Sequence, residues 1–219
     1  MDFAAYFPVW DKLTPDQQTQ LARSAVLRTV AAGTVVHRGG TGCTGLLLVR
    51  SGQLRAFMIS PEGREITLYR LVDRDLCLMS ATCILRSIQF EVTITAEKQS
   101  SFWVIPPDKY RQLMEVSAPV ANYTNEVMAA RFSEVMWRTE QILWQSFDKR
   151  LAAFLLEEAG LEDSDTLTIT HEAIANHMGS AREVVTRMLR YFQSEGLVQL
   201  RRGTVTLAAP DRLRALAES

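Results

Sequence analysis

The 219-residue sequence is poor in the residues that most enzyme sites and disulfide scaffolds require. It contains three histidines and three cysteines, and it shows no Ser-His-Asp set, phosphate-binding loop or histidine cluster with metal-ligand spacing. So few histidines leave little for acid–base catalysis. A sparse, odd set of cysteines suits a reducing cytoplasm better than a disulfide framework. The sequence therefore predicts neither an enzyme nor a secreted disulfide-rich protein.

Long hydrophobic runs and a strong net charge are also missing. No apolar stretch approaches the roughly 18 residues that a membrane span needs, and the N-terminus lacks the basic and apolar regions of a signal peptide. Because the net charge is −1, any DNA affinity must come from local charge. With 47% hydrophobic and 22% charged residues, we expect a cytoplasmic globular protein with two ordinary domains and no membrane partner.

Between about residues 26 and 106 the sequence consists of short β-rich segments separated by turns. Gly33, Gly39-Gly40, Gly52 and Pro61-Glu62-Gly63 fall at the turn positions. This spacing predicts an antiparallel roll or barrel. Only residues 72–88 interrupt the pattern, and they could hold a short helix. The expected strands are 27–30, 34–36, 46–50, 53–59, 65–71, 90–96 and 101–105.

Helical patterns flank the β-rich region. On the N-terminal side of the β-rich region, Thr14 followed by Pro15 predicts the start of a helix, since proline is favoured at the first helical position. After Pro106-Pro107 we expect a helix over 108–115 and a much longer one to about Trp144.

The long helix carries apolar residues on two faces, so we expect it to pack against its own β domain and against the same helix of a second subunit. An alternative is a single broad apolar face in a monomeric core. The coiled-coil seam comprises Met128, Phe132, Val135 and Ile142, and the second stripe comprises Val120, Tyr123, Val127, Ala130 and Trp137.

After a helix that begins at Asp148, the C-terminal region shows a helix-turn-helix pattern. Ile174, Ala175 and Met178 define a short amphipathic helix, and the glycine that follows ends it. Ser180 is expected to cap a second helix. Two short helices joined by a glycine turn, of which the second is basic near its start, predict a helix-turn-helix. In that motif the second helix lies in the DNA major groove. Its expected buried stripe is Val184, Val185, Met188, Leu189 and Phe192, and its expected polar face is Arg182, Glu183, Thr186, Arg187 and Arg190.

Two short strands about Gly203 follow the second helix and predict a wing. Arg201 and Arg202 at its tip are within reach of phosphate. Between residues 182 and 202 there are five arginines and two glutamates, a local excess of three positive charges. An αα-hairpin with solvated arginines is the alternative, and the wing favours DNA binding over it.

The order of a β-roll, a long helix and a winged helix-turn-helix resembles the Crp/Fnr family of bacterial transcription regulators over nearly the whole chain. The specific residues are the Gly33 to Gly52 pattern, the segment Asp148-Lys149-Arg150-Leu151-Ala152 and the segment from Gly179 to Arg187. The resemblance implies an α+β fold. Residues 1–116 would form a sensor domain with an antiparallel β-roll of double-stranded β-helix or jelly-roll type, like that of cyclic-nucleotide-binding domains. Residues 117–146 would form the dimerisation helix and hinge, and residues 147–219 the winged helix-turn-helix.

The resemblance also implies a homodimer, formed through residues 117–146, that binds double-stranded palindromic promoter DNA and contacts RNA polymerase. Arg182, Glu183 and Arg187 fall on the family's base-reading positions. Arginine can pair with guanine O6 and N7 and glutamate can accept from cytosine N4, so we expect a TGTGA or TTGA half-site. Thr186 stands where other members have glycine or serine, which leaves the middle of the half-site open. The expected DNA-binding residues are Ser180, Arg182, Glu183, Thr186, Arg187, Arg190, Arg201 and Arg202.

Two effectors used elsewhere in the family do not suit this sequence. Cyclic-nucleotide-binding members use an arginine–serine pair for the phosphate, and here Phe90-Glu91 takes its place, with a carboxylate that would repel phosphate. Arg86-Ser87 could substitute only across a gap in the alignment. An iron–sulfur cluster needs four thiolates, whereas this chain has three cysteines and none before Cys43.

Cys77 and Cys83 are the remaining candidates for sensing, and they predict a redox or reactive-sulfur sensor. One thiolate would attack an oxidant or persulfide, and its partner would resolve the product. Six residues of unbroken helix rise about 9 Å, whereas a disulfide needs Cα atoms within about 7 Å. A direct bond therefore requires the segment to bend or unwind.

Two alternatives for the sensor domain stay open. Both cysteines could be buried structural thiols in an effector-independent regulator. The domain could instead hold haem and sense nitric oxide or carbon monoxide, with His37, Cys77 and Met79 as conceivable axial ligands. His171 and His177 lie in the helix-turn-helix, where we expect them to contact the DNA backbone or to pack.

Overall fold

The computed structural model describes residues 3–40, 42–81, 83 and 91–219. The chain divides into two compact units, one formed by Met1–Met58 and Leu68–Val135 and the other by Ile59–Thr67 and Met136–Ser219. This division falls inside the long helix, so the domain boundaries expected after residues 116 and 146 stay a prediction. Within the described residues, every helix is either too short or too polar to cross a bilayer.

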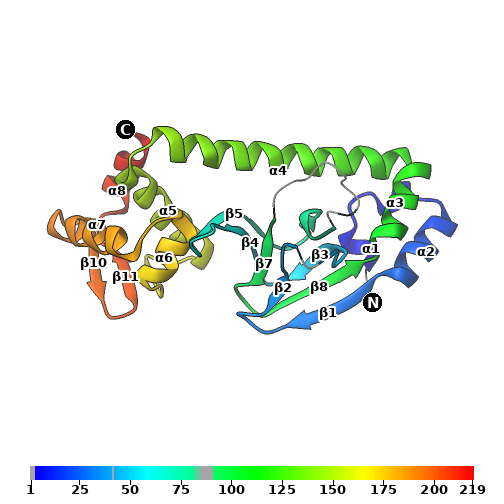
Figure 1. The fold of residues 1–219 in the computed structure, drawn as a ribbon, viewed down its shortest axis with the longest axis horizontal. Helices are drawn as coiled ribbons and strands as arrows, with labels where there is room; N and C mark the ends of the chain where they lie inside the picture. The colour runs from blue at the N-terminus through cyan, green and yellow to red at the C-terminus, as the bar shows by residue number, and fades with distance from the viewer. Residues whose placement is uncertain (1–2, 41, 82, 84–90) are drawn as a thin grey trace. The chain divides into compact units, whose positions relative to one another are not determined.

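The first unit is built on two four-stranded sheets, with strand orders β1-β8-β3-β6 and β2-β7-β4-β5 (Figure 1). β8 pairs antiparallel with both β1 and β3, and β7 pairs antiparallel with both β2 and β4. The expected antiparallel β-roll is therefore confirmed. The strands are β1 (Val26–Val30), β2 (Val35–His37), β3 (Leu46–Ser51), β4 (Leu54–Ile59), β5 (Glu65–Leu71), β6 (Leu76–Cys77), β7 (Thr93–Ala96) and β8 (Ser100–Ile105).

Strand β3 explains why the roll contains a continuous apolar run. Successive side chains of a strand point to opposite faces of the sheet. Leu46 and Leu48 accordingly join the cluster that contains the flanking helices, whereas Leu47 and Val49 join the cluster between the two sheets. All four side chains are 0% exposed. The sheet that contains β3 is therefore covered on both faces, which is why the usual apolar–polar alternation is absent there.

The helices of the first unit are α1 (Phe3–Tyr6), the 3-10 turn η1 (Trp10–Lys12), α2 (Pro15–Ser24) and α3 (Pro107–Val116). The predicted start of α2 is confirmed. The Thr14 hydroxyl accepts a hydrogen bond from the Gln17 backbone N–H at 3.3 Å, and the Gln17 side chain accepts from the Thr14 N–H at 3.0 Å. Of the interrupting segment 72–88, the structure describes β6 and the 3-10 turn η2 (Met79–Ala81), while residues 82 and 84–88 lie outside the described part.

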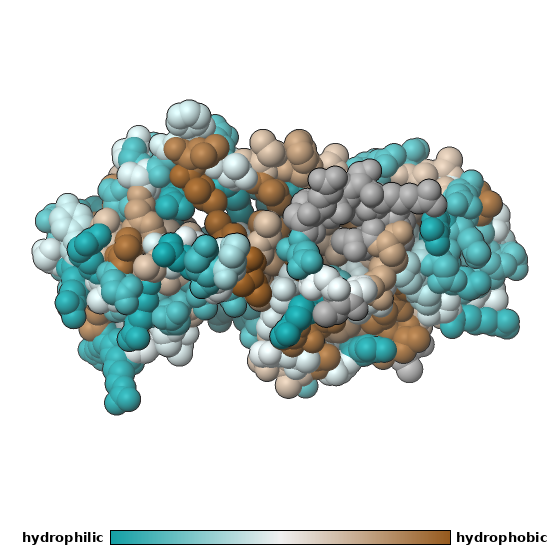
Figure 2. Space-filling view, in the orientation of Figure 1, coloured by the Kyte–Doolittle hydropathy of each residue, from teal (hydrophilic) through white to brown (hydrophobic). Residues whose placement is uncertain are grey.

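Helix α4 (Ala118–Trp144) is 27 residues long and has two apolar faces, as expected. Their membership differs from the prediction, because Met128 and Val135 pack against the roll instead of forming part of an outer seam. Trp137, expected on the second stripe together with Val120, is 53% exposed, whereas Val120 is 0% exposed. Periodicity alone places residues on a common face but does not say which face points inward. The exposed apolar residues of α4 are Phe132, Met136, Trp137, Ile142, Leu143 and Trp144, and Figure 2 shows hydrophobic surface along this helix.

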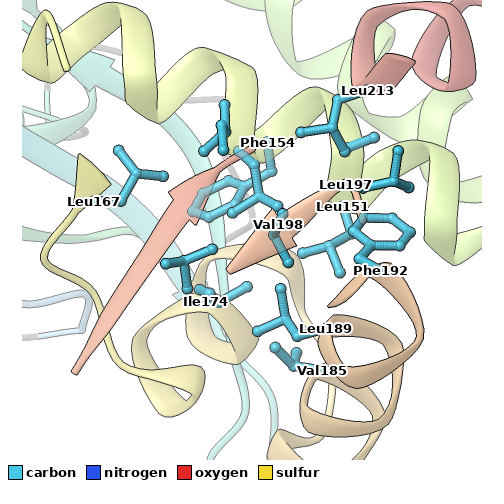
Figure 3. Close-up of a cluster of buried hydrophobic side chains, with 14 of the residues drawn as sticks. Leu151, Phe154, Leu167, Ile174, Val185, Leu189, Phe192, Leu197, Val198 and Leu213 are labelled. Atoms are coloured by element: carbon cyan, nitrogen blue, oxygen red, sulfur yellow. The ribbon is translucent and has the colours of Figure 1, made fainter. Parts of the chain in front are cut away.

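The second unit contains the winged helix-turn-helix, which confirms the predicted C-terminal fold. Its sheet has the order β10-β11-β9, and β9 pairs antiparallel with β11. The core draws on every helix of this region (Figure 3). Neither β9 nor α8 was expected from the sequence, yet Leu167 of β9 is 2% exposed and Leu213 of α8 is 0% exposed. The elements are α5 (Phe147–Glu162), β9 (Thr166–Leu167), α6 (His171–Met178), α7 (Arg182–Ser194), β10 (Val198–Arg201), β11 (Thr204–Leu207) and α8 (Pro210–Glu218).

Candidate nucleic-acid interface

Helix α6 ends where the sequence predicts, and its start is capped by a residue that the sequence analysis did not single out. The Thr170 hydroxyl accepts from the Ala173 N–H at 3.1 Å and caps its start. Gly179 ends the helix with φ +65°, a left-handed conformation that costs glycine little. The turn brings the next helix across α6, which is the arrangement of a helix-turn-helix.

Helix α7 begins later than predicted. Its N-cap is Ala181 and its first residue is Arg182, so Ser180 lies in the turn and does not cap the helix. The cap position needs an extended backbone, which Ala181 adopts at φ −87° and ψ 144°. Glu183 is consequently the second helical residue, whereas a cap at Ser180 would have made it the third. Because alanine has no side-chain acceptor, the first N–H groups of α7 lack a side-chain cap.

Helix α7 separates its two faces sharply. Val185, Leu189 and Phe192 are 0% exposed and pack in the core of the second unit (Figure 3). On the opposite side, Arg182, Glu183, Arg187 and Arg190 are exposed and Thr186 is half-buried, and these five residues line one surface hollow. The helix therefore presents four long charged side chains around one hydroxyl.

A second hollow joins α7 to the wing and to the start of α6. It is lined by Thr170 and His171 from α6 and its cap, by Arg182 from α7, and by Arg201 and Arg202 from the hairpin tip. Arg201 and Arg202 are exposed, and the hairpin tip is hydrophilic in Figure 2. Three arginines from two elements, α7 and the wing, thus line one cleft beside a single carboxylate, Glu172. The excess of positive charge suits a phosphate of a DNA backbone.

His171 connects the two hollows. Its Nδ1 lies 2.9 Å from the Thr186 Oγ1, a hydrogen bond between α6 and the middle of α7. Partial burial lowers the pKa of His171 below its ordinary value of 6.5, and the positive charges of Arg182 and Arg190 lower it further. The sequence predicts DNA-backbone contact or packing for this residue, but no local spacing signals its bond to a residue fifteen positions later. His177 packs its ring against Phe154, with centroids 5.4 Å apart.

The structure corrects the predicted cysteine pair. Cys83 forms a disulfide with Cys43, with Cα atoms 6.0 Å apart, and Cys77 is the free cysteine. The segment is not an unbroken helix, because Cys77 lies in β6 and a 3-10 turn follows it. The Thr44 backbone N–H donates a hydrogen bond to the Ser80 carbonyl at 3.0 Å, and this bond holds the β2–β3 loop alongside the 3-10 turn. Cys43, which the sequence left without a role, is therefore the partner.

The two kinds of cysteine differ in exposure and in acidity. Cys43 and Cys83 are exposed. Cys77 is 1% exposed, and its Sγ lies 3.9 Å from the Tyr69 hydroxyl. Burial raises the pKa of the Cys77 thiol, so the reactive thiolate is disfavoured there. Cys77 therefore behaves as a small buried apolar residue.

Comparison with known proteins identifies the family. The family model of the Crp-like helix-turn-helix domain matches residues 149–216, and that of the cyclic nucleotide-binding domain matches residues 27–117. A crystal structure of a candidate Crp/Fnr-family transcriptional regulator from Eubacterium rectale is 59% identical. The match covers 98% of this chain and 100% of that one, with a TM-score of 0.96. The chain belongs to the Crp/Fnr family of transcription regulators.

Characterised relatives agree with this assignment. The fumarate and nitrate reduction regulatory protein of Salmonella typhimurium is 26% identical over 201 residues, covering 87% of this chain and 78% of its own. Its counterpart from Escherichia coli K12 is 25% identical over the same length. This Crp/Fnr chain is therefore a DNA-binding transcription regulator and not an enzyme.

Within the family, an iron–sulfur cluster fits the cysteines of this chain poorly. A cluster held by four thiolates does not fit a chain in which two of three cysteines are joined and the third is buried. Of the conceivable haem ligands, His37 lies in β2 and bonds Thr44 through Nδ1 at 2.8 Å, whereas Cys77 lies in β6 of the other sheet. In the described part of the chain, no group of three or more His, Cys, Asp or Glu side chains is assembled to hold a metal ion.

The segment aligned with the family's phosphate-binding cassette is described only in part. Arg86-Ser87 and Phe90 lie outside the described residues, so their expected roles stay predictions. Glu91 is exposed and lies directly against the glycine pair of the β2–β3 loop. A Cβ added to Gly39 would clash with the Glu91 Cβ, so the position does not accommodate a side chain. Gly39 therefore permits the close approach of residue 91.

Proposed function

We propose that this chain is a cytoplasmic, homodimeric regulator whose binding to palindromic promoter DNA depends on the oxidation state of Cys43 and Cys83. The observation that carries the proposal is the disulfide between two exposed cysteines of the sensor domain. Exposed sulfur atoms are open to attack by oxidants and by thiol reductants. The chain therefore keeps the sensing role expected for Cys83, with Cys43 in place of Cys77 as its partner.

The proposed reaction needs only the two thiols and an oxidant. One thiolate attacks hydrogen peroxide and becomes a sulfenic acid, and water leaves. The second thiol then attacks that sulfur, the disulfide forms, and a second water leaves. Two electrons pass from the thiols to the peroxide. A polysulfide can replace peroxide. One thiolate then attacks a sulfane sulfur and becomes a persulfide as a shorter polysulfide or hydrosulfide leaves, and the second thiol attacks the inner sulfur of that persulfide, so that the disulfide forms and hydrosulfide leaves. Reduction by a dithiol reverses either reaction through a mixed disulfide.

A chain of contacts inside the first unit links this region to α4. Asp75 precedes β6, and its Oδ1 lies 2.8 Å from Nη2 of Arg131 on α4. Arg131 also pairs with Glu134 at 2.9 Å and lies over the Tyr69 ring at 4.8 Å. The Arg131 side chain is 16% exposed, so this network is partly shielded from solvent. A change in the segment from Asp75 to Cys83 can therefore reach α4 through Arg131.

The proposed dimer and DNA contacts use surfaces that one subunit leaves open. The exposed apolar side chains of α4 would pair with those of a second copy, since such a surface favours burial. Two α7 helices related by two-fold symmetry would then read the two halves of a palindrome. The proposed DNA contacts are Ser180, Arg182, Glu183, Thr186, Arg187, Arg190, Arg201 and Arg202. RNA polymerase is the further proposed partner.

The proposal is tested by measuring the Kd of the dimer for TGTGA- and TTGA-type palindromes by fluorescence anisotropy. Protein is treated with dithiothreitol, peroxide or polysulfide, and mass spectrometry records the state of each cysteine. We expect the Kd to differ between the joined and reduced forms, and Cys43→Ser and Cys83→Ser to abolish that difference. Cys77→Ala is the matched control and should keep it. A Kd that is the same in both forms of the wild type would contradict redox control.

A further inference from the structure

The bond between His171 and Thr186 joins the cleft proposed for the DNA backbone to the side of α7 proposed to face the bases. His171 lines the cleft that contains Arg201 and Arg202, and Thr186 lines the hollow shared with Arg182, Glu183, Arg187 and Arg190. The two side chains meet at 2.9 Å through Nδ1 and Oγ1. In the part of the chain that the structure describes, the other ring nitrogen, Nε2, has no hydrogen-bond partner.

The direction of this bond depends on which ring nitrogen carries the proton. Because burial and nearby arginines lower the pKa of His171, its ring is neutral at neutral pH and carries one N–H. A DNA phosphate in the cleft offers only acceptor oxygens. It would therefore bind the tautomer with the proton on Nε2, which leaves Nδ1 as an acceptor. The Thr186 hydroxyl must then donate its proton to Nδ1.

We propose that His171 is a positioning residue that fixes Thr186 as a hydrogen-bond acceptor toward the DNA bases. This inference rests on the proposed role of α7 as the base-reading helix. With its proton directed at His171, the Thr186 oxygen can receive an N–H from DNA but cannot donate. In the major groove such donors are the adenine N6 and cytosine N4 amino groups, whereas guanine offers O6 and N7 acceptors. Thr186 would therefore favour adenine or cytosine over guanine at the base that it faces.

The test is a double-mutant cycle on base preference. Kd is measured for palindromes with each of the four bases at the position that a randomised half-site selection assigns to Thr186. We expect His171→Ala to reduce the ratio of the Kd with guanine to the Kd with adenine or cytosine roughly three- to ten-fold, which is the factor that one hydrogen bond contributes. Thr186→Val, which keeps the shape and removes the hydroxyl, should cause the same loss. The double variant should lose no further preference, and His171→Asn, whose Oδ1 can accept in place of Nδ1, should restore it.

Two further measurements separate this role from a general effect on folding. The preference at the position read by Arg187 should be unchanged in every variant, and circular dichroism should show intact helices. Nitrogen NMR of the wild-type protein–DNA complex should show an unprotonated Nδ1 on His171. A protonated Nδ1, or a base preference unchanged by His171→Ala but lost in Thr186→Val, would overturn the inference alone. Failure of the wild type to bind any palindrome in either redox state would overturn the proposed function together with it.

Discussion

Reduction of the Cys43–Cys83 disulfide should destabilise the β-roll by an amount that follows from its position in the chain. The bond closes a loop with a sequence separation of 40 residues, which contains β3, β4, β5 and β6. In the chain-entropy description, the disulfide restricts the unfolded chain more than the folded one, and a loop of this length contributes about 4 kcal/mol. Both sulfur atoms belong to exposed residues, so a mild dithiol should reach the bond without unfolding the protein.

The measurement is urea unfolding followed by tryptophan fluorescence at one fixed protomer concentration, because dimerisation would otherwise change the apparent stability. Trp10 and Trp103 report on the roll, since both pack with its helix-facing cluster. Reduction should lower the free energy of unfolding of the wild-type protein by about 4 kcal/mol. Reduction of the Cys77→Ala variant should lower its free energy of unfolding by the same amount. Cys43→Ser/Cys83→Ser should not respond to the reductant. Equal unfolding of oxidised and reduced wild type would refute the reasoning, because the cysteines would not constrain the chain.

Three more outcomes follow from single side chains. Leu189→Ala, at a side chain 0% exposed in the second unit, should destabilise that unit by about 2–5 kcal/mol in chemical unfolding, and a change below about 1 kcal/mol would contradict its place in the core. Arg182→Ala should weaken binding to the palindrome by roughly 1–3 kcal/mol and relax one base position, whereas equal loss on random DNA would show a phosphate contact only. Burial lowers the pKa of His37 below 6.5, so its proton binds more readily in the unfolded state. Stability should be full above pH 6.5 and fall as the pH drops below it. His37→Asn should flatten that fall in a pH series of thermal unfolding, and an unchanged slope would count against this cause.

Features set by near neighbours in the chain were predictable. Thr14, Pro15 and Gln17 form the start of α2 through contacts three residues apart, and Gly179 ends α6 through its own backbone freedom. The strands could also be predicted, because turn glycines and β-branched residues act on the backbone within a few positions. The start of α7 was predicted wrongly because Ser180 and Ala181 are both adjacent candidates for its N-cap. Only the backbone conformation in the folded protein shows that Ala181 is the N-cap.

By itself, the sequence determined the antiparallel roll, the long helix after it, the winged helix-turn-helix without β9 and α8, and the polar face of α7. Each of these depends on periodicity or on turn residues that act over a few positions. Only the tertiary structure decided that Cys83 meets Cys43, that Met128 and Val135 face inward on α4, and that His171 holds Thr186. These contacts join residues that strand pairing or helix crossing brings together, so the spacing along the chain carries no signal for them.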